Sequence, residues 1–425
     1  MTVAWSGRFS EWMRQSRFAR NVWQVARANV LAQALPVIAA PLLTRLYSPA
    51  DFGGLALFAS VLSVALAVGT VRFEWSVPSA RAGTTAAALM VLGSLALCGC
   101  SFLLLFAWVA ARHRLPSAWS VIDAMGWLVL PALVGGGIQQ LLQAWHVRRA
   151  DLSPMGRAKV MQSAANLLVC LAAAKLGLYG LVAGAVAGVW VGLRTLWLHA
   201  TGLSAAIARL DRRRLAVAWR RFRAEAGWST LASAVSTASF AIVPFMLARH
   251  YSAVEVGYYA LMQRVALGPV GLVGAAVSQS FWAEAARLVR ADPALLSSLY
   301  RRSSWRLVWV ALPLALVALA GPLFVGPLFG DVQWAGAGWV LAASVPMLIG
   351  QVIVSPLSHL IIHGKQHWQA LWDVLRMALL AGSIEGLGRA GVDFPWTVLG
   401  LSTVMGAMYG LLMLLNRRAL KFAQE

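Results

Sequence analysis

Four arginines lie within apolar stretches of the sequence that are long enough to cross a lipid bilayer: Arg27, Arg194, Arg264 and Arg376. A charged side chain at the bilayer centre costs at least about 2.5–3.5 kcal/mol on insertion scales, so it usually faces a wet cavity or a charged partner. Arg27 and Arg194 lie near the ends of their stretches, where a long side chain can extend to the membrane surface. Arg264 and Arg376 lie deeper, and we expect both to have a partner or a ligand.

The chemistry open to Arg264 and to Arg376 differs because their neighbours differ. Asp373 precedes Arg376 by about one helical turn on the same face, so the two can form an internal salt bridge with no role in binding. Arg264 has no acidic residue within one turn and adjoins Gln263. Because a guanidinium group matches phosphate oxygens through paired hydrogen bonds, the unpaired arginine favours an anionic ligand.

The first apolar stretch adds polar side chains to this candidate site. Asn29 and Gln33 are four residues apart and share a helix face, whereas Arg27 lies on a neighbouring strip. A cavity that concentrates fixed arginine and few carboxylates selects for an anion. The residues predicted to bind substrate are Arg264, Arg376, Arg27, Asn29, Gln33, Gln263 and Asp373.

The elements that must position these residues are membrane-spanning helices. Hydrophobic residues make up 60% of the 425-residue chain and charged residues only 12%, so the bilayer must be the solvent. A hydrocarbon core of about 30 Å needs about 20 apolar residues per helix. Such segments lie at about 23–45, 53–71, 86–110, 119–144, 157–175, 178–199, 228–248, 255–280, 305–328, 333–358, 367–387 and 394–415.

The basic residues predict the orientation of these helices. Most of the 36 lysines and arginines fall in every second gap between the segments, which is the positive-inside bias of a protein with both termini in the cytoplasm. This topology accounts for most of the net charge of +21, so a nucleic-acid partner is not expected. Basic residues on these loops attract anionic membrane lipids.

The predicted architecture is an all-α polytopic membrane protein, with about twelve transmembrane helices in two six-helix lobes around a central cavity. Residues 1–21 are expected to form an interfacial helix, 22–199 the N-lobe and 228–416 the C-lobe. The very basic segment 200–227 is expected to be an amphipathic linker helix on the cytoplasmic surface. A calmodulin-like or nucleic-acid site is the weaker interpretation of that segment. Residues 417–425 are expected to form a cytoplasmic tail.

The two halves resemble each other where the first and seventh spans end. RLYSPADFGGLAL (Arg45–Leu57) aligns with RHYSAVEVGYYAL (Arg249–Leu261). Six positions are identical, and Asp51 and Glu255 share their charge. Six helices separate the copies, so both have the same orientation, which predicts a parallel repeat with a substrate site between the lobes. Prolines interrupt several spans; Pro36 and Pro41 in the first are the best candidates for a hinge, the alternative being static curvature.

Motifs of other chemistries are missing from the sequence. It has no phosphate-binding loop of an ATPase, no His-Glu-X-X-His and no Gly-X-Ser-X-Gly. Cys98, Cys100 and Cys170 fall within predicted spans and are interpreted as buried structural thiols. We therefore expect no catalytic residues, no metal and no cofactor.

The N-terminal run from Arg20 to Pro78 resembles the opening of the bacterial polysaccharide (O-antigen, capsule) flippases, within the multidrug/oligosaccharidyl-lipid/polysaccharide exporter superfamily. The resemblance rests on Gln33, PLLTRLY at residues 41–47, Ser48-Pro49, Asp51-Phe52-Gly53 and Arg72-Phe73-Glu74 with Pro78. Residues 256–281 resemble the family more loosely. The chain departs from the family pattern after Arg72, where it reads Trp75-Ser76-Val77-Pro78 instead of Ile-X-Leu-Pro.

This resemblance implies twelve helices around a cationic cavity and a substrate of undecaprenyl-diphosphate-linked oligosaccharide, flipped across the bacterial inner membrane by alternating access. We expect the outer gates to be the pairs Arg45–Asp51 and Arg249–Glu255, and an inner gate to be Arg72–Glu74. Membrane lipids and a polysaccharide polymerase are the other expected partners. The alternatives are a cation-coupled small-molecule exporter on the same scaffold and, less favoured, a membrane polymerase or ligase.

Overall fold

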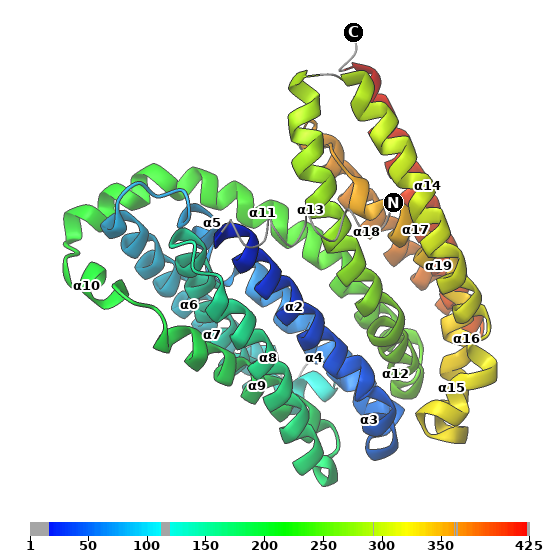
Figure 1. The fold of residues 1–425 in the computed structure, drawn as a ribbon. Coiled ribbons are helices and arrows are strands. Elements are labelled where there is room, and N and C mark those ends of the chain that lie inside the picture. The colour runs from blue at the N-terminus through cyan, green and yellow to red at the C-terminus, as the bar shows by residue number, and fades with distance from the viewer. Residues whose placement is uncertain (1–16, 112–119, 292, 361, 363, 423–425) are drawn as a thin grey trace.

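The structure is a computed structural model that describes residues 17–111, 120–291, 293–360, 362 and 364–422. All regular elements within these residues are helices (Figure 1). The first half of the chain contains α2 (Arg17–Ile38), α3 (Ala40–Leu46), α4 (Pro49–Gly69), α5 (Phe73–Ser76), α6 (Gly83–Ala111), α7 (Ser120–Arg148), α8 (Ser153–Ala172), η2 (Ala174–Leu176) and α9 (Leu178–Leu198).

The second half begins with a long helix and continues through several broken ones. Its elements are α10 (Leu203–Ala208), α11 (Arg212–His250), α12 (Ala253–Met262), η3 (Gln263–Leu267), α13 (Gly268–Ala291), α14 (Pro293–Leu319), α15 (Gly321–Phe329), η4 (Asp331–Trp334), α16 (Ala335–Ala343), α17 (Val345–Ile353), η5 (Ser355–Leu357), α18 (Gln366–Arg389) and α19 (Phe394–Phe422).

The apolar helices confirm a multi-pass membrane protein. Among the described residues, seven helices are long and apolar enough to cross a bilayer, or eight if the bent pair α16–α17 counts as one span. The predicted spans that fall short of this criterion correspond to α2, α8, the α12–α13 region and α18. These helices carry the polar and charged side chains discussed below, which lowers their mean hydropathy.

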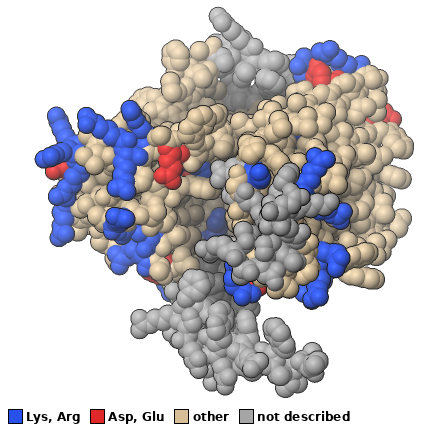
Figure 2. Space-filling view, turned by 90° about the horizontal axis from the view of Figure 1, so that it is seen from above, with Lys and Arg blue, Asp and Glu red and all other residues tan. Residues whose placement is uncertain are grey.

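The helices gather into two groups. The groups diverge toward the end of the molecule where α2 and α11 begin (Figure 1). In the first group α2 packs on α8, α8 on α9, and α7 on α9 and α4; in the second, α17 packs on α14 and α19, and α18 on α19 and α11. The end where α2 and α11 begin and α19 finishes is called the basic end here. Figure 2 shows the molecule from this end. Many Lys and Arg side chains gather at its left edge, where α10 and the start of α11 lie in Figure 1.

Two boundaries differ from the sequence prediction. The amphipathic segment expected at 200–227 is not a separate helix, because α11 runs from Arg212 through the seventh predicted span to His250 without a break. Asp211 caps its first turn by accepting a hydrogen bond from the backbone N–H of Arg214 (2.7 Å), and a single interior glycine, Gly227, is too weak to end a helix. Similarly, residues 17–21 belong to α2, while residues 1–16 lie outside the described part.

The first and tenth predicted spans are each divided. Pro36 lies inside α2, the helix is interrupted at Ala39, and Pro41 lies in the first turn of α3. The tenth span bends by 52° between α16 and α17, at Ser344 and the following Val345-Pro346. Because proline cannot donate a backbone hydrogen bond, these breaks fall where the sequence places it.

The repeated segments meet each other at the end opposite the basic end. Ser48 and Asp51 form a capping box that starts α4, and Ser252 and Glu255 form the equivalent box that starts α12. These two helices cross closely. A Cβ added to Gly53 would lie 2.2 Å from the carbonyl oxygen of Ala253, and one added to Gly257 would lie 1.8 Å from that of Pro49.

This crossing is symmetric, since Pro49 and Gly53 occupy the same positions in the first repeat as Ala253 and Gly257 in the second. Further contacts join the two groups at the same end: the indole Nε1 of Trp334 donates to the carbonyl of Thr44 (2.9 Å), and the Trp334 ring meets that of Phe52 edge-on. One hydrophobic cluster runs through both groups here. The molecule is therefore held together at this end and diverges toward the basic end.

Candidate functional site

Arg264 lies in an irregular turn in the middle of the eighth predicted span. Residues Gln263–Leu267 form a π-helical segment, η3, between α12 and α13. Pro269 follows shortly afterwards and has no N–H to donate to the carbonyl of Val265, which disfavours a regular α-helical ladder at this point. Single π-helical turns are frequent at functional sites because they redirect a side chain without ending the helix. Here the redirected side chain is an arginine.

A cavity of about 330 Å³ lies between the two helix groups beside this turn. Its lining comes from α2, α8, η3 and the start of α13: Ala32, Gln33, Pro36, Val37, Lys159, Gln162, Ser163, Arg264 and Gly268. Two of these side chains are basic and none is acidic. The cavity is therefore a concave, positively charged surface with amide and hydroxyl groups beside the charges.

Arg264 is available for a ligand in this structure. It takes part in none of the ion pairs formed within the described residues, and its guanidinium lies 5.8 Å from the ring centroid of Phe52. The aromatic face contributes a weak attraction to the cation and leaves its N–H donors free for oxygen acceptors. Burying such a charge without a carboxylate is costly unless water or an anion satisfies it.

The α8 side of the cavity is not among the residues predicted to bind substrate, although it lies within the span predicted at 157–175. Lys159 lies on the first turns of α8 with Gln162 and Ser163, spaced so that all three share one face. Gln139 of α7 donates to the Oε1 of Gln162 (2.9 Å) and fixes its orientation. The polar i, i+3, i+4 pattern in an otherwise apolar span was the signal available in the sequence.

The α2 side contains only part of the predicted set. Gln33 and Pro36 line the cavity, and the hydroxyl of Ser163 in α8 donates to the carbonyl of Ala32 (2.7 Å), which fastens the two helices together. Arg27 is exposed nearer the basic end and is not among the lining residues. The side chain of Asn29 lies outside the described part of the structure.

Gln263 and Arg264 are adjacent but point to different surroundings. Gln263 interacts with the hydroxyl of Tyr259, which is almost completely buried in the second half. Gln263 is not a lining residue of the cavity.

Arg376 is not brought to the cavity. Its guanidinium donates to the carboxylate of Asp373 (2.8 Å) and to the hydroxyl of Ser239 in α11, and only 2% of the residue is exposed. The rings of Phe240 and Trp372 lie 3.9 Å and 4.5 Å from it, one from α11 and one from α18. The internal salt bridge, the alternative raised from the sequence, is the arrangement present.

The two predicted outer gate pairs are absent from this conformation. Asp51 and Glu255 each accept hydrogen bonds from the serine that begins their own helix, while Arg45 is exposed and forms no ion pair within the described residues. Arg249 reaches across to Glu385 of α18 (3.7 Å) instead. Glu385 also binds His250 and Arg389, each at 2.8 Å, so it joins the ends of α11 and α18.

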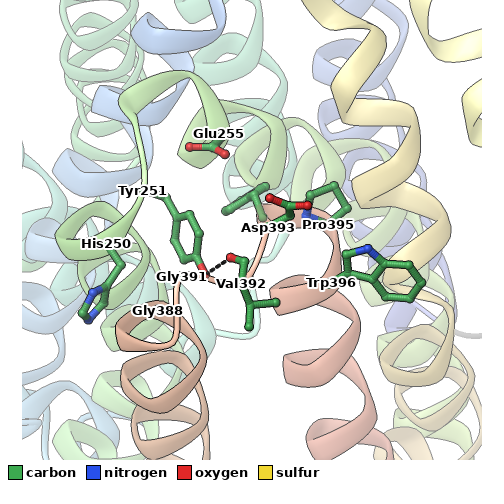
Figure 3. A pocket seen from close by; sticks show the side chains of 10 residues that line it. His250, Tyr251, Glu255, Gly388, Gly391, Val392, Asp393, Pro395 and Trp396 are labelled. Carbon is green, nitrogen blue, oxygen red and sulfur yellow. Dashed lines mark hydrogen bonds between the residues drawn. The ribbon is translucent and has the colours of Figure 1, made fainter.

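The tyrosines of the two repeats have equivalent roles beside these serines. Tyr47 donates to the carbonyl of Cys170 at the end of α8, and Tyr251 donates to that of Val392 between α18 and α19 (2.9 Å; Figure 3). Each hydroxyl therefore anchors a neighbouring helix hairpin of its own half. Around Tyr251 a pocket of about 520 Å³ remains, with Glu255 and Asp393 at its wall (Figure 3). In the first half Gly177 packs close to Asp51 at the corresponding place.

The pair expected at the inner gate is present. Arg72 lies 3.5 Å from Glu74, and its guanidinium also donates to Ser233 of α11. Arg72 has a left-handed backbone conformation, with φ of 54°, at the turn between α4 and α5. Glu74 accepts a hydrogen bond from Thr70 (2.6 Å). This cluster lies at the basic end and connects the first half to α11.

Comparison with known proteins places the chain in a family. The family described as "Polysaccharide biosynthesis protein" matches residues 42–337, which is more than half of the sequence. The chain belongs to this family. The matched region contains the glycine crossing, the π-helical turn and every residue that lines the cavity from α8 onward. No curated protein sequence matches the chain significantly.

Solved structures similar to this one are transporters of the superfamily suggested by the sequence. A lipid II flippase, MurJ, in an inward closed conformation aligns with a TM-score of 0.70 at 10% identity, covering 94% of this chain and 87% of the flippase. An inward-facing multidrug resistance transporter of the MATE family aligns at 0.61 and 15% identity, covering 94% and 95%. A superfamily transporter from Pyrococcus furiosus, with a binding pocket of reverse polarity, aligns at 0.56 and 12%, covering 97% and 98%. At these identities the likeness concerns the fold.

Proposed function

We propose that the protein is a flippase that moves undecaprenyl-diphosphate-linked oligosaccharide, the repeat unit of an O-antigen or a capsule, across the bacterial inner membrane. The observation that carries this proposal is the cavity between the helix groups, where Arg264 and Lys159 lie without any carboxylate in the lining. A diphosphate offers several oxygen acceptors and the opposite charge, and arginine binds phosphate through paired hydrogen bonds.

The amide side chains extend this site beyond the charges. Gln33 and Gln162 can each donate and accept hydrogen bonds, which suits the first sugar hydroxyls attached to a diphosphate. The oligosaccharide then occupies the space between the diverging groups, and the polyprenyl chain remains in the lipid. A cavity lined by amide, hydroxyl and basic side chains fits this headgroup better than it fits a cationic drug.

The direction of transport follows from the topology. The basic end is assigned to the cytoplasm by the positive-inside rule, and the lobes diverge there, so the substrate enters from the cytoplasmic leaflet. The glycine crossing of α4 and α12 closes the periplasmic side in this state. For release, the contacts at that end separate and the cytoplasmic ends approach, with the interruption at Ala39 acting as the hinge of α2.

The proposal is tested in a strain whose own flippase is deleted and whose surface glycan depends on this protein. Arg264→Ala with Lys159→Ala should reduce surface glycan at least tenfold, since a charged hydrogen bond contributes about 1.5–3 kcal/mol. Arg194→Ala is the matched control: it removes an arginine from another span, and its side chain is exposed outside the cavity. Membrane levels of each variant are measured by immunoblot.

Wild-type glycan in the double variant would overturn the proposal. Accumulation of lipid-linked repeat units on the cytoplasmic face would support it, whereas accumulation on the periplasmic face would indicate a polymerase. Changed drug sensitivity with unchanged glycan in the deletion strain would point to a small-molecule exporter. The observed ion pair of Asp373 with Arg376 argues against that alternative, because it occupies a membrane-embedded carboxylate that a coupling cation would need.

A further inference from the structure

A second cationic pocket lies far from the cavity, at the basic end of the second helix group. It has a volume of about 580 Å³ and is formed by the start of α14, the end of α17 and the end of α19. Arg301 of α14 and Arg417 of α19 provide its charge, and no acidic residue lines it. Neither arginine belongs to an ion pair within the described residues.

The floor of this pocket is fixed by packing. Tyr300 is 4% exposed, and its ring packs against those of Phe281 and His359 at 6.3 Å and 5.2 Å. The hydroxyl of Ser304 donates to the carbonyl of Tyr300 (2.9 Å), which also fixes the side chain of that serine. The polar wall beside the two arginines is therefore preformed, while the arginines themselves remain exposed.

The exposed face of α14 indicates where the pocket lies relative to the membrane. Arg301 is followed on the same helix face by exposed apolar residues at intervals of four and three positions: Trp305, Trp309, Leu312, Leu316 and Leu319. In a membrane protein such a stripe faces the acyl chains, and tryptophans near its end lie at the lipid headgroups. Arg301 therefore lies at the level of the headgroups.

The exposed face of α19 also carries an apolar residue close to its arginine. Leu414 is 56% exposed and precedes Arg417 by one helical turn. Within the pocket, Ile353 of α17 and Met413 of α19 form an apolar wall below the charges. Charge at the membrane surface combined with an apolar surface beneath matches the two parts of a phospholipid.

We propose that this pocket is a binding site for a resident membrane phospholipid with an anionic headgroup. Its phosphate contacts Arg301 and Arg417, with Ser297 as a hydroxyl donor near by, and its acyl chains lie over Ile353, Met413 and the stripe of α14. The occupant is a lipid of the leaflet at the basic end, and the site is separate from the transport cavity. The bound lipid joins the start of α14 to the end of α19 and stabilises the second helix group.

The experiment measures lipid binding to the purified full-length protein in detergent by native mass spectrometry. Phosphatidylglycerol and phosphatidylcholine with identical acyl chains are titrated separately, and phosphatidylglycerol should bind more tightly. Arg301→Ala with Arg417→Ala should weaken phosphatidylglycerol binding about thirtyfold, because each basic residue near an anionic headgroup contributes about fivefold. Binding of phosphatidylcholine should change little.

The chain provides a matched control in the adjacent arginines. Arg302→Ala with Arg418→Ala removes the same charge from the same two helices, but these residues do not line the pocket. Equal weakening in the control and the pocket variant would show general attraction to the basic surface and overturn the site. The single variants R301Q and R417Q, each expected to weaken binding about fivefold, serve if the double variant does not fold.

The remaining outcome concerns the identity of the lipid. A polyprenyl diphosphate that displaces phosphatidylglycerol from the wild type but not from the pocket variant would show that the pocket receives the transported substrate, which overturns the proposal of a resident phospholipid. Unchanged competition in Arg264→Ala would assign that displacement to this pocket and not to the transport cavity.

Discussion

Arg264 and Arg376 both lie well inside apolar segments of the sequence, yet their environments differ sharply. Arg376 is 2% exposed, bound to Asp373 and Ser239, and enclosed between two aromatic rings. Arg264 lines a cavity, has no carboxylate partner within the described residues, and lies in a π-helical turn. A charged residue inside an apolar segment is therefore a sign of a structural or a binding role. Only its partners show whether it stabilises the fold or binds a ligand.

The largest expected effect comes from Arg376→Leu alone. Removing this guanidinium leaves the carboxylate of Asp373 buried without compensation, which typically costs about 3–5 kcal/mol. We expect a markedly lower melting temperature in detergent, followed by tryptophan fluorescence, and less protein in the membrane. Arg264→Leu should leave the melting temperature unchanged or raise it, since no partner is lost. Similar losses in both variants would contradict the distinction drawn here.

Replacing Arg264 by lysine should have a smaller effect, and on transport only. The charge remains, but lysine lacks the planar group that binds two phosphate oxygens in parallel. We expect surface glycan synthesis to fall about tenfold at normal protein levels, which corresponds to about 1.4 kcal/mol, the difference made by one charge-assisted hydrogen bond. Full activity of the lysine variant would mean that charge alone is recognised.

Lys159→Met tests the partly screened charge on the other side of the cavity. Lys159 is solvent-exposed, so its interaction with an anion is worth about 1 kcal/mol or less. Substrate affinity should fall no more than about fivefold, and high salt should reduce the difference between variant and wild type. Arg157→Met, an exposed neighbour in α8 outside the cavity lining, is the control and should not change affinity.

The smallest change is expected when both partners of the buried pair are replaced together. Asp373→Leu with Arg376→Leu removes both charges, and such replacements of buried ion pairs are often neutral or slightly stabilising. The melting temperature should return to within a few degrees of the wild-type value, and surface glycan should persist. Loss of glycan in this stable double variant would assign the pair a role in transport.

The sequence predicted those features that depend on local physical rules. Apolar segments and basic loops are encoded in short stretches of chain, and a multi-pass helical fold follows from them. Arg264 was recognised because it has no acidic neighbour. The structure then showed which other side chains reach the same space, and these come from helices far apart in sequence.

Other features depended on tertiary packing and could not be predicted from one sequence. Lys159 lies near the predicted start of a span, where a basic residue usually marks a loop. The repeat of Tyr47 and Tyr251 indicated internal symmetry but not that the two copies touch. The partner of Arg249 is Glu385, from a helix more than a hundred residues away, and no spacing rule identifies such a pair.

The crossing of α4 and α12 has a consequence for the way in which the end opposite the basic end can open. Its two glycine contacts are related by the internal repeat: Gly53 lies against Ala253, and Gly257 lies against Pro49. A rigid movement that breaks one of them breaks the other simultaneously, so neither can serve as a separate latch. We therefore expect this end to open in one step, without an intermediate in which only one of the two contacts is broken.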